Sequence, residues 1–189
     1  MMADTILTLD QLESIFYNLT CQLLGLNPED PNNFGKVRVS WQKDGTPGWA
    51  ITDDIAFLRI STLNDPYTQQ RDTVYTGGNS GESNVITSYT RVHSIQWIIY
   101  GPNSYENANL LRNGLFKSDL SLNNLFLVLD VPVPIRSPEL FNGRWWERSD
   151  FSVRFNEKAI LQGTVPVIQG VNIQIKTEEG VTENVNITS

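Results

Sequence analysis

The chain has 189 residues, of which 40% are hydrophobic and 10% aromatic, and its formal net charge is −7 at pH 7. These values suit one domain of ordinary size with an apolar core, and they argue against global disorder and against a protein that grips nucleic acid phosphates. One cysteine, Cys21, and one histidine, His93, exclude an intrachain disulfide, a multi-cysteine zinc site and a His-pair metal site.

The start of the chain lacks the basic residues and the long apolar run of a secretory signal. No apolar run in the sequence approaches the length of about 18 residues that spans a bilayer. We therefore expect a protein that folds in a reducing cytoplasm and has no membrane partner.

The first predicted element is an amphipathic helix that begins after Thr8. Gln11 follows Thr8 at the spacing of a capping box. Apolar side chains then recur at the spacing of one helical face, at Leu12, Ile15, Phe16, Leu19, Leu23 and Leu24. Gly25 and Pro28 end the pattern, and we expect this helix to dock on a sheet.

Two strands are predicted next. Residues 36–42 alternate, with Val37, Val39 and Trp41 on one face, and residues 55–63 form a more apolar run. Residues 43–48 between them contain two glycines and a proline, which are turn-forming residues. We expect the second strand to return along the first as a hairpin.

Residues 64–84 differ in character, because they hold hardly any aliphatic side chains and include a glycine-rich run at 77–81. Loops this long are uncommon in compact domains and are often functional. We expect a long loop that is either a flexible hairpin tip or an ordered interaction arm. The glycine-rich run lacks the Lys and Ser/Thr that follow it in a phosphate-binding loop.

The second half of the chain continues the same pattern of elements. Residues 85–100 form the longest predicted strand, a helix follows from Asn103 or Ser104 to about Leu115, and further strands are predicted at 125–130, 145–155 and 167–176. The final residues, 177–189, are predicted to form a tail or an arm that reaches another subunit. The fold class is therefore α+β, a mostly antiparallel β-sheet with two packed α-helices in one domain over residues 1–189.

No part of the sequence indicates an enzyme. Cys21 stands among apolar residues of the first helix, which favours a buried core thiol. His93 falls within a strand, with no nucleophile in a suitable setting beside it. Neighbouring acids, such as Asp53 and Asp54, point to opposite faces of an extended chain. We expect no catalytic residue, no cofactor and no metal.

The most informative stretch is Arg144-Trp145-Trp146-Glu147-Arg148. Aromatic residues beside arginines can stack on nucleobases or anchor a protein interface. Alternation places Trp145 and Glu147 on one face of a strand and Trp146 and Arg148 on the other. The acidic balance disfavours nucleic acid, so a protein interface is the first interpretation, followed by core packing and by ligand stacking.

Three segments resemble the phage neck terminator family, a group of head–tail joining proteins that includes tail terminators. They are residues 94–104 (SIQWIIYGPNS), residues 144–155 (RWWERSDFSVRF) and residues 168–173 (IQGVNI). The resemblance covers roughly the C-terminal half of the chain, whereas the N-terminal helix and strands agree only in their order.

The resemblance implies a structural component of the virion neck, with a tail-terminator-like fold. Such proteins typically assemble as six-fold rings that cap the tail tube and meet the head connector. The implied partners are other copies of the chain, the tail tube protein and head connector or neck proteins. DNA would pass through the lumen without specific binding, and acidic walls would suit that passage because they repel phosphates.

The interface is expected to use the loop at 64–84, the strand around Trp146 and the C-terminal arm. Its candidate residues are Asn64, Tyr67, Arg71, Tyr75, Trp146 and Arg148. Two alternatives stay open: another head–tail connector or completion protein, and a small carbohydrate-binding module in which Tyr105, Trp145 and Trp146 form a sugar platform.

Overall fold

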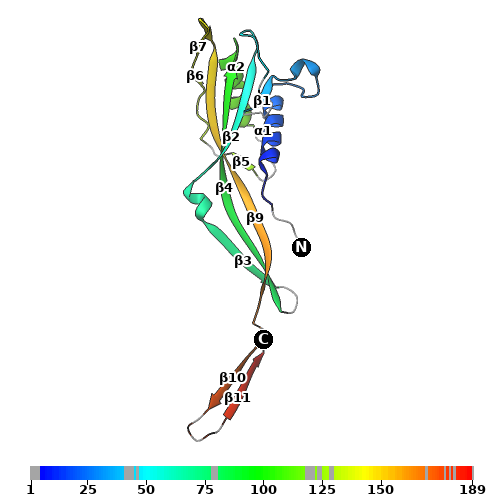
Figure 1. The fold of residues 1–189 in the computed structure, drawn as a ribbon, viewed down its shortest axis with the longest axis vertical. Coiled ribbons are helices and arrows are strands. Elements are labelled where there is room, and N and C mark those ends of the chain that lie inside the picture. The colour runs from blue at the N-terminus through cyan, green and yellow to red at the C-terminus, as the bar shows by residue number, and fades with distance from the viewer. Residues whose placement is uncertain are drawn as a thin grey trace. The chain divides into compact units, whose positions relative to one another are not determined.

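A computed structural model gives the structure of the chain and describes residues 5–40, 45, 47–77, 81–117, 122, 125–127, 130–168, 170–176, 178, 180 and 182–188. The elements in chain order are α1 (Leu9–Leu23), the 3-10 turn η1 (Pro31–Asn33), β1 (Val37–Val39), β2 (Ile55–Leu63), the 3-10 turn η2 (Pro66–Gln69), β3 (Arg71–Gly77), β4 (Glu82–Tyr100), α2 (Ser104–Leu115), β5 (Leu125–Leu127), β6 (Ile135–Arg136), β7 (Glu139–Phe141), β8 (Arg144–Trp146), β9 (Arg148–Pro166), β10 (Gly170–Lys176) and β11 (Thr182–Thr188) (Figure 1). Strands dominate this order, and the α+β class is confirmed.

The described strands form one large sheet and two small ones. The main path of the large sheet is β1-β2-β4-β9-β5, with β3 paired to β4 and β6 paired to β9. β2 is antiparallel to β4, and β5 and β6 are antiparallel to β9, whereas β1 is parallel to β2. The pairs β7–β8 and β10–β11 are separate antiparallel two-stranded sheets.

The chain divides into two compact units. The larger unit comprises residues 6–70 and 89–159, and the smaller unit contains Thr5, residues 71–88 and the chain from residue 160 onward. Strands β4 and β9 contribute residues to both units. The expectation of a single domain stays a prediction.

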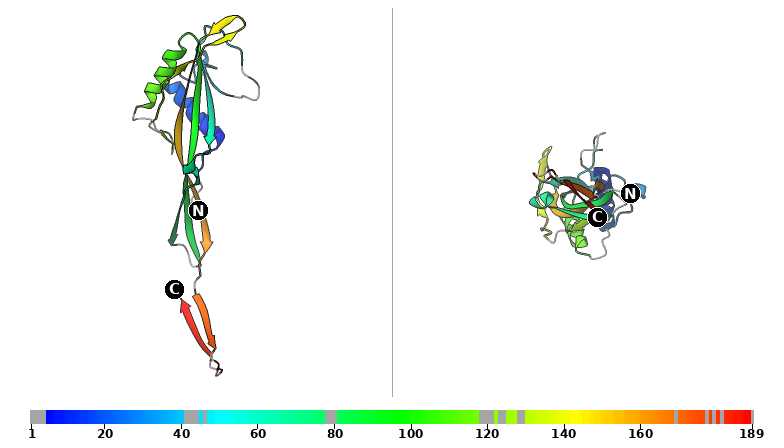
Figure 2. Two further views of the ribbon diagram at one scale, coloured as in Figure 1. Left: turned by 90° about the vertical axis from the view of Figure 1, so that its left-hand side faces the viewer. Right: turned by 90° about the horizontal axis from the view of Figure 1, so that it is seen from below.

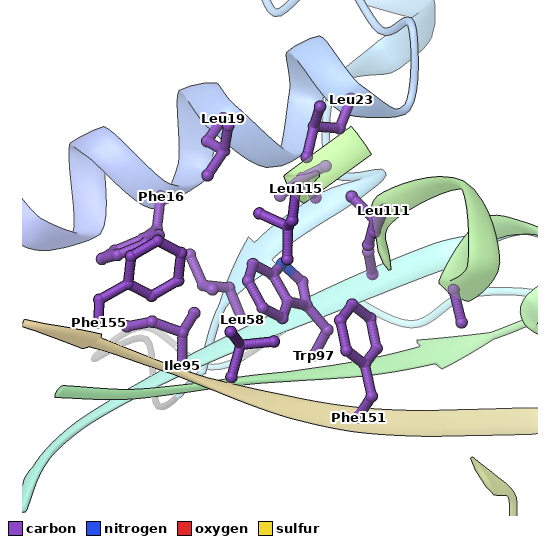
Figure 3. Packing of buried hydrophobic residues seen from close by; sticks show 14 of the residues in the cluster. Phe16, Leu19, Leu23, Leu58, Ile95, Trp97, Leu111, Leu115, Phe151 and Phe155 are labelled. Carbon is purple, nitrogen blue, oxygen red and sulfur yellow. The ribbon is translucent and has the colours of Figure 1, made fainter. Parts of the chain in front are cut away.

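The core of the larger unit lies between its two helices and one face of the sheet (Figure 3). Phe16 of α1 packs edge-on against Phe155 of β9, with ring centroids 4.9 Å apart. Trp97 of β4 stacks on Phe151 of β9, also at 4.9 Å, with only 16° between the ring planes. The Trp97 indole Nε1–H donates to the Thr20 hydroxyl at 2.9 Å, so this buried polar group is satisfied inside an apolar core.

Helix α1 begins and packs as its sequence predicts. The Thr8 hydroxyl accepts from the Gln11 backbone N–H at 3.3 Å, and the Gln11 side chain accepts from the Thr8 N–H at 2.8 Å, which completes the capping box. Leu12, Leu19 and Leu23 lie on the buried face. The apolar spacing therefore identified the face that meets the sheet.

Two glycines allow close approaches in the larger unit. A Cβ at Gly114 of α2 would lie 2.5 Å from Cδ2 of Leu23, so the glycine lets the two helices come together. Gly101 joins β4 to α2 with φ of +114°, and a Cβ there would lie 2.6 Å from the backbone oxygen of Asp53. Space and backbone conformation both exclude a side chain at Gly101, whereas a side chain at Gly114 would require Leu23 to shift.

A buried polar network fastens the N-terminal segment to the sheet. His93 Nε2 and Glu157 Oε2 are 2.7 Å apart, and both side chains are almost fully buried. Glu157 also accepts from the Leu7 backbone N–H at 2.8 Å, and Arg91 lies 3.2 Å from the same carboxylate. The other imidazole nitrogen, Nδ1, is 3.2 Å from the Thr62 hydroxyl. His93 is thus held on both sides by structural partners.

The expected hairpin of residues 36–42 and 55–63 is wrong, because β1 and β2 are parallel. The backbone N–H of Ala56 donates to Lys36 O at 2.7 Å, and that of Ser40 donates to Leu58 O at 2.8 Å. Parallel strands need a crossover of about a dozen residues or more, and residues 40–54 supply it. Of the predicted turn at 43–48, residues 43, 44 and 46 lie outside the described residues, as does Trp41.

The expected long loop at 64–84 is also corrected. The segment contains η2, the whole of β3 and the first residues of β4. Thr73, Val74 and Tyr75 favour extended structure, and β3 gains a partner because it pairs with β4. Within the turn between these strands, residues 78–80 lie outside the described residues.

The expected tail at 177–189 contains strand β11, which is antiparallel to β10. Its apolar positions are too few to show a period on their own. The strand forms because each of its seven residues lies opposite one of β10, in a register that pairs Val185 with Ile173.

Candidate interaction site

Five aromatic residues gather in the larger unit, on side chains that point away from the core. We call them the aromatic cluster: Trp49, Phe57, Tyr100, Phe141 and Trp146. Trp49 is its centre, with ring centroids 5.2 Å from Phe57, 5.6 Å from Tyr100 and 6.0 Å from Trp146. Since side chains alternate along a strand, Phe57 and Tyr100 leave the sheet on the face opposite their buried neighbours Leu58 and Ile99.

Arg38 of β1 holds the Trp49 segment against the sheet. Its guanidinium donates to the backbone oxygens of Gly35 and Pro47. The same group lies 5.4 Å from the Trp49 ring and 5.8 Å from the Phe57 ring, within the range of cation–π attraction. Burial lowers the pKa of Arg38, and nearby Asp53 opposes that effect.

Charged groups border the aromatic cluster on its other side. Arg148 donates two hydrogen bonds to the carboxylate of Asp150, at 2.8 and 2.7 Å, and also pairs with Glu139. The hydrogen bonds to Asp150 raise the pKa of Arg148, although desolvation opposes them. A two-pronged arginine–carboxylate pair of this kind fixes the orientation of both side chains.

Tyr100 connects the aromatic rings to the charged groups. Its hydroxyl donates to Glu139 Oε2 at 2.9 Å, and its ring lies 5.7 Å from the guanidinium of Arg148. Burial, followed by the hydrogen bond to Glu139, raises the pKa of Tyr100 to about 12. Tyr100 therefore acts as a neutral hydrogen-bond donor at physiological pH.

A cavity of about 310 Å³ opens within the aromatic cluster. Its lining is mainly aromatic, with one carboxylate: Gly48, Trp49, Tyr100, Glu139, Phe141 and Trp146. The indole Nε1–H of Trp49 is buried and has no hydrogen-bond partner among the described residues. The walls suit apolar side chains, and the unpartnered N–H can donate to an acceptor on a bound group.

The β7–β8 hairpin covers the cluster with one face and exposes the other. Asn142 and Gly143 form its turn with φ of 50° and 73°, as a tight two-residue turn of the primed type requires. Leu140 and Trp145 lie opposite each other and are 61% and 64% exposed. In Figure 2 this hairpin, in yellow, projects past the ends of the long strands. Exposed Trp and Leu side chains side by side are typical of an interface.

The smaller unit presents a different kind of surface. None of its described side chains is buried, and all seven residues of β3 are exposed. Val74 is 54% exposed and Tyr75 65% exposed. The described side chains of this unit therefore form no hydrophobic core of their own.

The structure distributes the six predicted interface residues over both units. Trp146 and Arg148 belong to the aromatic cluster and its charged border, whereas Arg71 and Tyr75 lie on β3 of the smaller unit. Asn64 follows β2 and is exposed. The side chain of Tyr67, in η2, lies outside the described residues.

Sequence reasoning missed Trp49, Glu139 and Tyr100 as parts of this site. Tyr100 could have been found, because alternation along residues 95–100 places it on the face opposite Trp97. Trp49 and Glu139 carry no such signal, since each stands in an irregular or very short segment whose position depends on distant partners. Of the sugar-platform residues, Trp145 and Tyr105 are exposed, and Trp146 packs against Trp49.

A metal site needs several His, Cys, Asp or Glu side chains close together. Among those that the structure describes, no group of three or more His, Cys, Asp or Glu side chains could hold a metal ion. No helix in the described ranges is both long enough and apolar enough to cross a membrane.

The chain matches a known protein family. No curated protein matches the chain. The family model described as "Phage neck terminator protein" matches residues 10–180, which include both helices and most of the sheet. The chain therefore belongs to the phage neck terminator protein family, and it is a structural protein of the neck of the phage particle.

Proposed function

We propose that the protein is a ring-forming tail terminator. Six copies would close into a ring that caps the tail tube and joins it to the head connector. The family match over residues 10–180 carries this proposal, because it places the chain at the neck, where the tail meets the head.

The smaller unit supports association between copies. None of the described side chains of its strands is buried, and folded domains gain most of their stability from buried apolar surface. Contact with neighbouring subunits would supply the missing burial. In a protein that assembles in many copies, contacts between subunits can stabilise such strands, whereas an isolated monomer has no such contacts.

The second exposed surface belongs to the larger unit. Leu140 and Trp145 offer an apolar contact, and the cavity beside Trp49 offers a recess. A ring closes through heterologous contacts, in which one patch of a subunit meets a different patch of the next. The proposed contact residues remain Asn64, Tyr67, Arg71, Tyr75, Trp146 and Arg148.

The proposed partners follow from this role. Besides its own copies, the ring would contact the tail tube protein on one face and connector or other neck proteins on the other. DNA would pass through the lumen without specific binding, and the net charge of −7 per chain supports such passage. Assembly would take place in the host cytoplasm, without a cofactor and without enzymatic activity.

Ring formation and tube capping can be tested separately. Light scattering coupled to gel filtration, with negative-stain microscopy, should show a six-membered ring. When added to polymerising tail tube protein, the ring should shorten the tubes in proportion to its concentration. A chain that stays monomeric at all concentrations and leaves tube length unchanged would contradict the proposal. A ring that binds the connector but does not stop the tube would instead favour a head–tail completion protein.

A further inference from the structure

The β10–β11 hairpin is an amphipathic two-stranded sheet without a third strand among the described residues. Its seven paired positions place Val171, Ile173, Ile175 and Val185 on one face. These four side chains are 41–48% exposed. Gln174 and Lys176 lie on the other face, so the two sides differ in polarity, although the register places Glu183 opposite Ile175 at one end of the apolar face. Isolated two-stranded hairpins are at best marginally stable in water, so this one would gain stability from a further strand.

Strand β3 offers an edge that could receive the hairpin. It pairs with β4 only, which leaves the hydrogen-bonding groups of its other edge without a strand partner in the described sheet. Natural edge strands are commonly protected by proline, lysine or a bulge. Residues 71–77 contain neither proline nor lysine, and their two charged residues, Arg71 and Asp72, stand at the start of the strand. The following residues, Thr73 to Thr76, all favour extended structure.

The hairpin and the edge match in length and in chemistry. β3, β10 and β11 each have seven residues, which corresponds to about 23 Å of extended chain. Pairing would join backbone N–H and C=O groups on both sides, as when a peptide adds a strand to a sheet. In the joined sheet, the apolar face of the hairpin would be continuous with the face of β3 that carries Val74 or with the face that carries Tyr75.

The connection to the hairpin is too short to reach β3 of the same chain. The backbone N–H of Val167 is held by Gly81 O at 3.1 Å, and β10 begins at Gly170. Three steps along the chain span at most about 11 Å. The order β3-β4-β9 requires a shift of about three strand spacings, or about 14 Å, to move from the end of β9 to the free edge of β3.

We propose that the β10–β11 hairpin of one copy pairs with the β3 edge of a second copy. The contact is head to tail, because donor and acceptor are different surfaces of the same chain, and repetition of such a contact closes a ring when the rotation between successive copies closes. This inference rests on the proposed function in that it names the segments through which the copies associate. It would pair the free edge of β3 and place the apolar residues of the hairpin beside the side chains of β3 in one continuous sheet.

The first test compares two neighbouring substitutions in the full-length protein. Ile173→Glu places a charge on the apolar face, whereas Gln174→Glu places the same charge on the polar face. We expect Ile173→Glu to raise the concentration for half-assembly by about 30-fold or more, the size of a strong interface residue, and Gln174→Glu to change it by less than about threefold. Circular dichroism should show that the larger unit stays folded in both.

Hydrogen exchange identifies the receiving edge. Amides of residues 71–77 should be protected in the assembled wild-type protein and should lose protection in Ile173→Glu, although the substitution lies on another segment. If β3 stays equally protected, or if Ile173→Glu still assembles, the proposed pairing is wrong even where the ring itself is confirmed. If β3 becomes protected only when the tail tube protein is added, a second copy is not the occupant.

A mixing experiment tests the head-to-tail arrangement. Val74→Pro and Tyr75→Pro are both made, because successive residues of a strand direct their N–H groups to opposite edges. One of the two variants therefore removes an N–H that points away from β4, towards the free edge. Mixed with Ile173→Glu, the folded edge variant should form 1:1 dimers, since one intact contact remains between the two chains. Absence of heterodimers would overturn the inference. If the mixture forms dimers that require an intact hairpin, while the wild-type protein forms no ring, the strand pairing is upheld. Only the proposed ring is then contradicted.

Discussion

Gly101 stands at the junction of β4 and α2, where backbone conformation and space act together. Its φ of +114° is rarely adopted by residues that have a Cβ. The nearest obstacles to a side chain are Asp54 Oδ1 and the backbone oxygen of Asp53, the latter 2.6 Å from an added Cβ. Asp54 is itself fixed, because it accepts two hydrogen bonds from Asn103 at 3.0 and 2.8 Å.

We expect Gly101→Ala to lower the free energy of unfolding by about 3 kcal/mol or more, because backbone strain adds to overlap with atoms that cannot move aside. Urea unfolding followed by circular dichroism measures the change. Gly25→Ala is the matched control, since Gly25 has φ of +67° but nothing within 4 Å of the added carbon. The control should lose only about 1 kcal/mol. Similar losses in both variants would refute the role of crowding.

Tyr100 provides a prediction about pH. Its pKa of about 12 lies above the ordinary value of 10, so the folded state holds the phenol proton more tightly than the unfolded chain does. The resulting stabilisation is complete below pH 10 and is lost as the pH rises from 10 towards 12. Absorbance at 295 nm should show a tyrosine that ionises with a pKa of about 12, and Tyr100→Phe should remove that step. Burial also raises the pKa of Tyr17, so a late contribution from Tyr17 should remain in the variant. Tyr75→Phe removes an exposed phenol on another strand, and the late step should persist in it.

At the scale of elements, local periodicity predicted some structures well and others poorly. The capping box at Thr8 and the spacing from Leu12 onward located α1, because both signals act within the helix itself. The direction of β1 and the existence of β3 and β11 depend on pairing partners far away in the chain. Intrinsic strand preference is weak compared with such pairing.

The same distinction explains which parts of the site could be predicted. Trp146 and Arg148 were found because an alternating strand with aromatic and basic residues indicates an interface. Trp49 reaches the cluster only because Arg38 and the parallel crossover bring its segment back onto the sheet. No local pattern could indicate that arrangement.

The β7–β8 hairpin gives a prediction at this scale. Replacing Leu140 and Trp145 with alanine should change the free energy of unfolding by less than about 0.5 kcal/mol, because both side chains are largely exposed. The same double variant should weaken binding to a neighbouring copy or to a neck partner by about tenfold or more. Calorimetry and light scattering measure the two effects. Phe116→Ala, at another exposed aromatic residue, should affect neither, and a double variant that assembles normally would remove this hairpin from the interface.

For the whole molecule, the net charge of −7 makes a prediction about DNA. Assembled protein should not bind double-stranded DNA measurably at about 0.15 M salt, because an acidic surface repels phosphates. Fluorescence anisotropy of a labelled duplex measures this, with a basic DNA-binding protein as the positive control. Binding that weakens steeply as salt increases would show that a basic surface faces the DNA and would contradict the proposed passive lumen.

Cys21 gives the protein a practical advantage for labelling. It is the one cysteine of the chain, it is 3% exposed in α1, and burial raises the pKa of its thiol although a hydrogen bond with Tyr17 opposes this effect. Alkylating reagents react with the thiolate, so the folded protein should label slowly at neutral pH. A cysteine introduced on an exposed strand can therefore carry a dye or spin label while the natural thiol stays in place. Distances between copies become measurable without first altering the core.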